Sequence, residues 1–146
     1  MNDDLKIEIH KKINSIDSNE RFNEVKTELE DRFGKIDEDM IIYMYEEWFE
    51  KLVKKLKLSH VNQTKNSIEL VFPEKVISKI DTEELFVDAY HISRMFRFIS
   101  RGTNLIIVLD IIKLEKHPIF YLVNLLSNIY DKYGKDIDLI KWFILN

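Results

Sequence analysis

The stretch Glu28-Leu29-Glu30-Asp31-Arg32-Phe33-Gly34 decides the fold, because it ends one helix and prepares the next. If residues 17–33 form a helix, four apolar side chains share one face at positions i, i+3, i+7 and i+11. These are Phe22, Val25, Leu29 and Phe33. Gly34 follows where a helix takes a left-handed C-terminal cap. Asp37 can then cap the start of a second helix, so the stretch predicts two helices separated by a sharp stop.

The acidic side chains of this first stretch lie off the apolar face. Glu24, Glu28 and Asp31 are expected on the solvent side of the helix. Glu28 and Asp31 are i, i+3 neighbours, so their carboxylates can face one partner together. Two interpretations remain open at this point. Either Glu28 pairs with Arg32 at i, i+4 on a solvated face, or the acids form a docking surface.

Length and composition indicate one globular domain over residues 1–146. The chain is 45% hydrophobic and 33% charged, which fits neither a disordered nor a membrane-embedded protein. No apolar run approaches the ~20 residues that span a bilayer, and the acidic N-terminus lacks the layout of a secretory signal. Since there is no cysteine, no disulfide framework or thiolate metal site is expected. A cytoplasmic location without membrane contact follows as an expectation.

The negative charge is concentrated in the first part of the chain. Before Ser59 there are 15 acidic and 11 basic residues, whereas 11 of each follow, which accounts for the net charge of −4. An excess of negative charge disfavours direct binding of DNA or RNA by this part. It is compatible with docking on a basic protein surface.

Periodicity predicts the remaining elements. Helical patterns are expected over residues 5–14, 17–33, 38–58 and 81–92, and in a long helix beginning near Pro118. Alternating patterns predict two hairpins, built from residues 59–62 with 67–72 and from 94–101 with 104–110. The fold class is therefore α+β, in which N-terminal helices pack with a small, mainly antiparallel sheet of about four strands and a long C-terminal helix.

Two finer expectations concern the ends of helices. Asp17 and Glu20 have the spacing of a capping box for the helix that precedes Gly34. Beyond Gly134, the tail from Asp136 to Asn146 is too apolar to remain loose. We expect this tail to dock on the body of the protein as a separate short helix.

No motif for catalysis, a cofactor or a metal is present. None of the four histidines has a second histidine at i+3 or i+4, and the chain contains neither a glycine-rich phosphate loop nor a Gly-x-Ser-x-Gly elbow. We therefore expect a protein that is not an enzyme, without cofactor. An alternative function is single-strand binding by Arg94, Arg97 and Arg101 of the second hairpin. It is disfavoured because Phe96 and Phe98 share one strand face, which indicates the core.

The motif Glu-Leu-x-Asp-Arg-Phe-Gly at residues 28–34 supports a family assignment when it is combined with Ile9-His10-Lys11-Lys12-Ile13. Together they resemble the C-terminal domain of bacterial transcription-repair coupling factor (Mfd). The hairpin with Ile68-Glu69-Leu70, the strand 104–109 and the final helix match by pattern and order. Many members have a proline shortly after the glycine, where this chain has Asp37; both residues suit a helix start.

The resemblance implies a regulatory role without catalysis. In the family, the parent protein is an ATP-dependent DNA translocase that dislodges stalled RNA polymerase and recruits the repair protein UvrA. Its last domain folds back on a UvrB-like module and covers the surface that UvrA would bind. Carried over to this chain, Glu28 and Asp31 match the acids that meet arginines of that module, and Arg32 and the cap Gly34 match the motif too. The remaining alternative is a free-standing adaptor with an acidic helical binding face.

Overall fold

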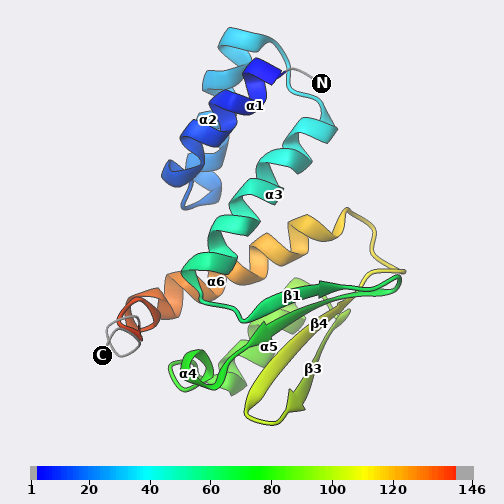
Figure 1. Cartoon of the computed structure of the whole chain (residues 1–146). Helices are drawn as coiled ribbons and strands as arrows, with labels where there is room; N and C mark the ends of the chain where they lie inside the picture. Colours follow the sequence, from blue (N-terminus) through cyan, green and yellow to red (C-terminus); the bar gives the residue numbers. More distant parts are fainter. Residues whose placement is uncertain (1–2, 141–146) are drawn as a thin grey trace.

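Local sequence signals explain the helices in the first part of the chain. The computed structural model of the protein describes residues 3–140. Helix α1 (Asp3–Lys12) and the 3₁₀ turn η1 (Ile13–Ser15) precede α2 (Asn19–Phe33) and α3 (Glu38–Lys55) (Figure 1). The predicted break between α2 and α3 is confirmed. Helix α3 stops at Lys55, before the predicted end at Leu58, because Lys57 adopts a φ of 55° that ends the helical backbone.

The second part contains the predicted antiparallel sheet, which confirms the α+β class. The strands are β1 (His60–Gln63), β2 (Ser67–Phe72), β3 (Phe96–Arg101) and β4 (Asn104–Asp110). They are arranged in the order β1-β2-β4-β3, with every neighbouring pair antiparallel. The two hairpins are therefore joined through their second strands, which leaves β1 and β3 at the borders of the sheet.

Three further helices complete the described chain. These are α4 (Glu74–Ile77), α5 (Thr82–Ile92) and α6 (Pro118–Asp138). Helix α4, directly after Pro73, is an addition to the sequence prediction. Helix α6 does not end at Gly134, as the sequence suggested, but continues through that glycine to Asp138. Leu139 then forms a turn and Ile140 is again helical. Ile137 and Ile140 are buried against the main core, and residues 141–146 of the predicted tail lie outside the described residues.

One hydrophobic cluster joins the helices to one face of the sheet. Helix α3 packs along α6, and α5 lies beside α6 on the sheet (Figure 1). Aromatic rings connect the helical layers, since the Phe22 and Tyr45 ring centroids lie 4.6 Å apart and the Tyr45 and Phe120 centroids 4.7 Å apart. Phe96 is buried in this cluster and Phe98 packs against it, so the prediction that both face the core is confirmed.

The opposite face of the sheet holds a smaller apolar cluster. Val71, Ile106 and Val108 are buried there and Ile99 packs against them. The alternation of Ile68, Leu70 and Phe72 with polar Glu69 favours one buried face of β2, whereas Val71 on the alternate face is buried as well. The reason is that Val71 packs with Ile106 and Val108 of the neighbouring strand β4. Leu105 to Leu109 of β4 are apolar throughout and are buried on both faces of the sheet.

Candidate docking surface

Helix α2 presents its polar side because its apolar side packs on the core. Phe22, Val25 and Leu29 are buried, as the spacing predicted, and Phe33 is partly buried against the core. The helix begins one residue later than expected: Ser18, and not Asp17, is the N-cap, and its hydroxyl accepts the backbone N–H of Arg21 at 3.0 Å. The opposite side of α2 carries exposed carboxylates.

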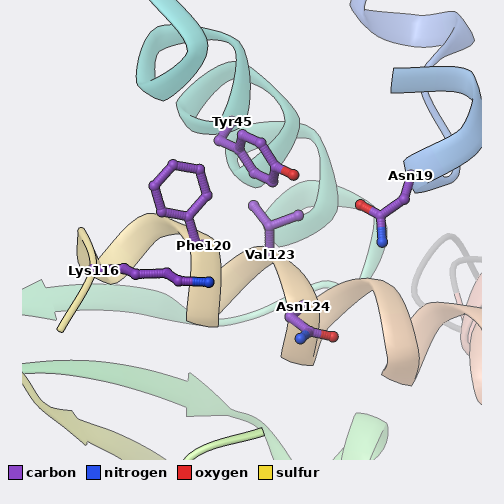
Figure 2. Close-up of a pocket in the computed structure, with 6 residues that line it drawn as sticks. All are labelled: Asn19, Tyr45, Lys116, Phe120, Val123 and Asn124. Carbon is purple, nitrogen blue, oxygen red and sulfur yellow. The ribbon is translucent and has the colours of Figure 1, made fainter. Parts of the chain in front are cut away.

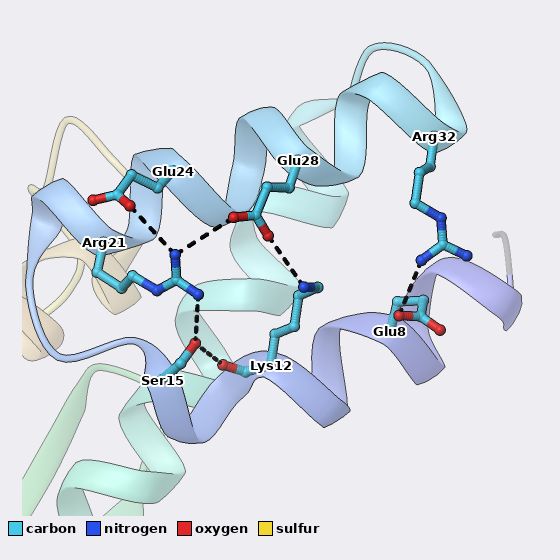
Figure 3. A network of polar contacts seen from close by, with 7 residues as sticks. All are labelled: Glu8, Lys12, Ser15, Arg21, Glu24, Glu28 and Arg32. Carbon is cyan, nitrogen blue, oxygen red and sulfur yellow. Dashed lines mark hydrogen bonds and ion pairs between the residues drawn. The ribbon is translucent and has the colours of Figure 1, made fainter.

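Glu28 lies at the centre of a network of ion pairs between α1 and α2 (Figure 3). Its carboxylate accepts a hydrogen bond from Lys12 Nζ at 3.1 Å and lies 3.5 Å from the Arg21 guanidinium. The hydrogen bond and charge of Lys12 lower the pKa of Glu28, and Arg21 adds to the effect. The Glu28 side chain is nevertheless 48% exposed. It is therefore an ionised carboxylate with a defined orientation that a partner can still reach.

Arg32 does not pair with Glu28, so the expected i, i+4 ion pair is wrong. The Arg32 guanidinium instead lies 3.2 Å from Glu8 of α1 and over the ring of Phe33, 5.1 Å from its centroid. Because α1 packs beside α2, Glu8 is brought within reach and competes for the arginine (Figure 3). Arg32 thus joins α1 to α2.

Asp31 differs from Glu28 in having no such neighbour. Within residues 3–140, no ion pair involves its carboxylate, and the residue is exposed. It lies one turn beyond Glu28 on the same helix, as the sequence predicted. Of these two exposed acids, Glu28 is therefore already neutralised in part and Asp31 is not.

The loop after α2 is held by three local hydrogen bonds. Gly34 is the C-cap of α2, as predicted, and its N–H bonds to the carbonyl of Glu30 at 2.9 Å. Its φ of 87° is positive, but its ψ of −179° lies outside the left-handed helical region that the sequence suggested. The Glu30 carboxylate accepts the N–H of Ile36 at 3.0 Å. This bond lowers the pKa of Glu30. Asp37 caps α3 by accepting the N–H of Met40 at 2.9 Å, also as predicted.

Comparison with known proteins identifies the family to which the chain belongs. The TRCF domain family model matches residues 1–83, more than half of the chain. The chain belongs to the TRCF domain family. The fold is similar to the solved structure of the C-terminal domain of a transcription-repair coupling factor, with a TM-score of 0.67 and 20% identity over 96% of this chain and 84% of that one. A search of curated proteins finds no match.

The match of this TRCF domain to its family includes every residue of the α2 motif. Residues 1–83 contain Glu28, Asp31, Arg32 and Gly34 as well as the basic segment of α1. Lys12 of that segment is a partner of Glu28, a contact that sequence reasoning missed. The signal that could have revealed it was the basic last turn of α1 followed by the acidic α2. Their alignment, however, was not contained in the sequence.

The arginines of the second hairpin do not form one basic platform. Arg97 Nε donates to Asp110 at 2.9 Å, which neutralises that charge. Arg94 precedes β3 in the chain. It lines a hollow beside α5 together with Val87, Tyr90 and His91. Since Phe98 packs on Phe86 of the core side, with ring centroids 4.3 Å apart, stacking rings for a single strand are not presented with these arginines.

A cleft of about 310 Å³ lies between the start of α2, α3 and α6 (Figure 2). Tyr45 and Phe120 form an apolar wall, and Asn19, Asn124 and Lys116 contribute polar groups at its border. These side chains include no carboxylate, no histidine and no hydroxyl nucleophile in contact with a base. Among residues 3–140, no group of acidic or histidine side chains is arranged to hold a metal.

No helix in the described part of the chain has both the length and the apolar character needed to cross a membrane. The longest, α6 (Pro118–Asp138), is amphipathic and interrupted by charged residues. Its apolar side packs on α3 and on the sheet.

Proposed function

We propose that this TRCF domain is a non-catalytic regulatory domain that docks on the UvrB-like module of its parent protein and masks the surface that UvrA binds. Membership of the family and the half-exposed, ionised Glu28 on α2 support the proposal. The parent would be an ATP-dependent DNA translocase that removes stalled RNA polymerase and recruits excision repair. Contacts with UvrA, polymerase and DNA would then belong to the parent.

The geometry of Glu28 suggests how such a contact can be reversible. Lys12 and Arg21 already hold the carboxylate, so an arginine of the module has to share it with them or displace them. Exposed ion pairs are weak, which makes the clamp easy to open. Linkage within one chain raises the effective concentration to the order of millimolar, so a weak clamp is sufficient in the resting protein.

Asp31 contributes a charge that no residue of the described chain neutralises. Its carboxylate is one helical turn from Glu28, so one basic patch can meet both groups. Arg32 keeps α1 and α2 together through Glu8. We assign it the role of supporting the acidic surface from within the domain.

The test is binding of this domain to the UvrB-like module of its own parent, measured by calorimetry at low and at moderate salt. Glu28→Ala/Asp31→Ala should abolish salt-sensitive binding and leave the circular dichroism spectrum unchanged. Glu83→Ala/Glu115→Ala is the matched control, because it removes the same charge from exposed positions elsewhere. Lys12→Gln should strengthen binding, since it removes an internal competitor for Glu28.

Equal binding by the acidic double variant and the wild type would place the interface elsewhere. Loss of binding in the matched control as well would reduce the contact to general electrostatic attraction. Binding to unrelated basic proteins with equal affinity would favour the free-standing adaptor.

A further inference from the structure

Strand β1 (His60–Gln63) is a border strand beside a groove. It pairs with β2 alone, and Val61 lies opposite Leu70 while Gln63 lies opposite Ile68. The N–H of Thr64 bonds to the carbonyl of Ser67 at 2.8 Å. Antiparallel ladders alternate, so residues 60, 62 and 64 direct their backbone groups to β2. Val61 and Gln63 therefore direct their N–H and C=O groups away from the sheet, where another strand can pair with them.

The groove adjoins this open border. It has a volume of about 750 Å³, and its walls are α3, β1 and the first turns of α6, which lie around the β1 end of the sheet in Figure 1. Phe49 and Ile68 are buried beneath it, and Val53 and Val61 form its apolar sides. The pairing register places the side chains of Val61 and Gln63 on the same sheet face as Ile68, which is the face that meets the helices.

A strand added beside β1 would therefore send alternate side chains into the groove. Successive side chains of a strand point to opposite faces, so residues i, i+2 and i+4 of the added segment lie on the helix side. The main-chain groups of Val61 and Gln63 supply affinity that does not depend on sequence, and the groove selects the alternate side chains.

The rim of the groove selects a basic segment. Glu46 and Glu50 of α3 are one helical turn apart and exposed at the groove, and neither has an ion-pair partner within residues 3–140. His117 also lines the groove, and its Nδ1 accepts the N–H of Ile119 at 3.1 Å. Two like charges at i, i+4 repel each other slightly, and a cation between them relieves this repulsion.

We propose that β1 and this groove bind an extended basic–apolar segment of another protein by strand addition. The segment places a lysine or arginine between Glu46 and Glu50 and an apolar side chain over Phe49 and Ile68. This surface is separate from the acids of α2, because it is formed by α3, β1 and α6. The proposal therefore does not depend on the function proposed above.

The test uses a panel of fluorescein-labelled octapeptides in which lysine or arginine alternates with valine, isoleucine, leucine or phenylalanine. Binding to the full chain is measured by fluorescence anisotropy, and amide shifts are mapped by NMR. We expect the best peptides to shift the amides of Val61 and Gln63 and of residues 46–53. Peptides with glutamate in place of the basic residues should bind at least tenfold more weakly.

Two variants separate the charge contribution from strand addition. Glu46→Gln/Glu50→Gln should weaken binding at least tenfold. Gln63→Pro removes an outward N–H without removing a bond to β2. It should bind at least tenfold more weakly than Gln63→Ala, which keeps this N–H and accounts for loss of the glutamine side chain. Circular dichroism checks that each variant is folded. Glu28→Ala/Asp31→Ala should leave peptide binding unchanged.

Several results would overturn the proposal. The first is that no peptide of the panel binds more tightly than about 1 mM. The second is that Gln63→Pro binds like Gln63→Ala, which would mean a contact through charge alone. The third is sedimentation of the chain as a dimer that the charge variant dissociates, because the occupant would then be a second copy.

Discussion

Replacing Gly34 with alanine adds one methyl group and tests the backbone conformation at the C-cap of α2. At φ 87° and ψ −179°, this residue occupies a backbone region that is essentially restricted to glycine. A Cβ at this position would meet no atom within 4 Å, so the cost of Gly34→Ala is conformational and not steric. Such strain costs about 1–3 kcal/mol. Alanine recovers about 0.4–1 kcal/mol by restricting the unfolded chain, so the middle of the two ranges leaves a net loss of about 1–2 kcal/mol.

The assay is urea unfolding followed by circular dichroism, with a thermal melt as a second measure. The midpoint should fall while the slope with denaturant stays unchanged, and the melting temperature should fall by roughly 3–8 °C. Lys35→Ala, at the next exposed position, is the control and should be close to neutral. Gly34→Asn should lose about as much as Gly34→Ala, because asparagine tolerates the left-handed helical region but not a ψ near 180°.

Two outcomes would refute this reasoning. If Gly34→Ala were as stable as Lys35→Ala, the backbone at residue 34 would not be held at positive φ. If Gly34→Asn kept wild-type stability while Gly34→Ala did not, the cap would be an ordinary left-handed one, and the stated ψ would be wrong.

Two further predictions concern side chains that hold loops. Lys51 Nζ donates to three carbonyls around η1, the shortest bond being 2.7 Å to Ile16. Lys51→Met keeps the aliphatic stem and should lose about 1–3 kcal/mol in urea unfolding; an unchanged midpoint would show that water replaces these bonds. Accepting the Ile36 N–H lowers the pKa of Glu30 below its ordinary 4.5. The ionised group therefore stabilises the fold above pH 4.5, and this contribution is lost as pH falls through the folded-state pKa. In a pH series of urea unfolding, Glu30→Gln should lose less stability than the wild type on acidification, and parallel curves would contradict the assignment.

The α2 motif shows how far sequence reasoning extends. Gly34 and Asp37 were predicted in their observed roles, because caps depend on the residue itself and its immediate neighbours. The choice of Asp17 over Ser18 as N-cap was wrong, since both residues can cap and the path of the chain from η1 decides between them. Tertiary contacts also decided where α6 ends. The helix continues through Gly134 because its burial between α3 and the sheet outweighs the low helix propensity of glycine.

For the candidate docking surface, too, the sequence predicted some properties and the tertiary structure decided others. Exposure of Glu28 and Asp31 followed from the apolar spacing of α2, because a helix buries one side and exposes the other. The partners of Glu28 and Arg32 did not follow from it. Long charged side chains can reach several residues, and only the packing of α1 beside α2 determined that Lys12 meets Glu28 and Glu8 meets Arg32.

The sequence by itself determined the periodicities, the caps, the motif that assigns the family and the class of the fold. These properties depend on residues a few positions apart, so they can be recognised along the chain. Only the tertiary structure decided the strand order, which makes β1 a border strand, and the groove that places Glu46 and Glu50 beside it. Strand order and grooves arise from contacts between distant segments, and the free energy of those contacts depends on how whole surfaces fit together.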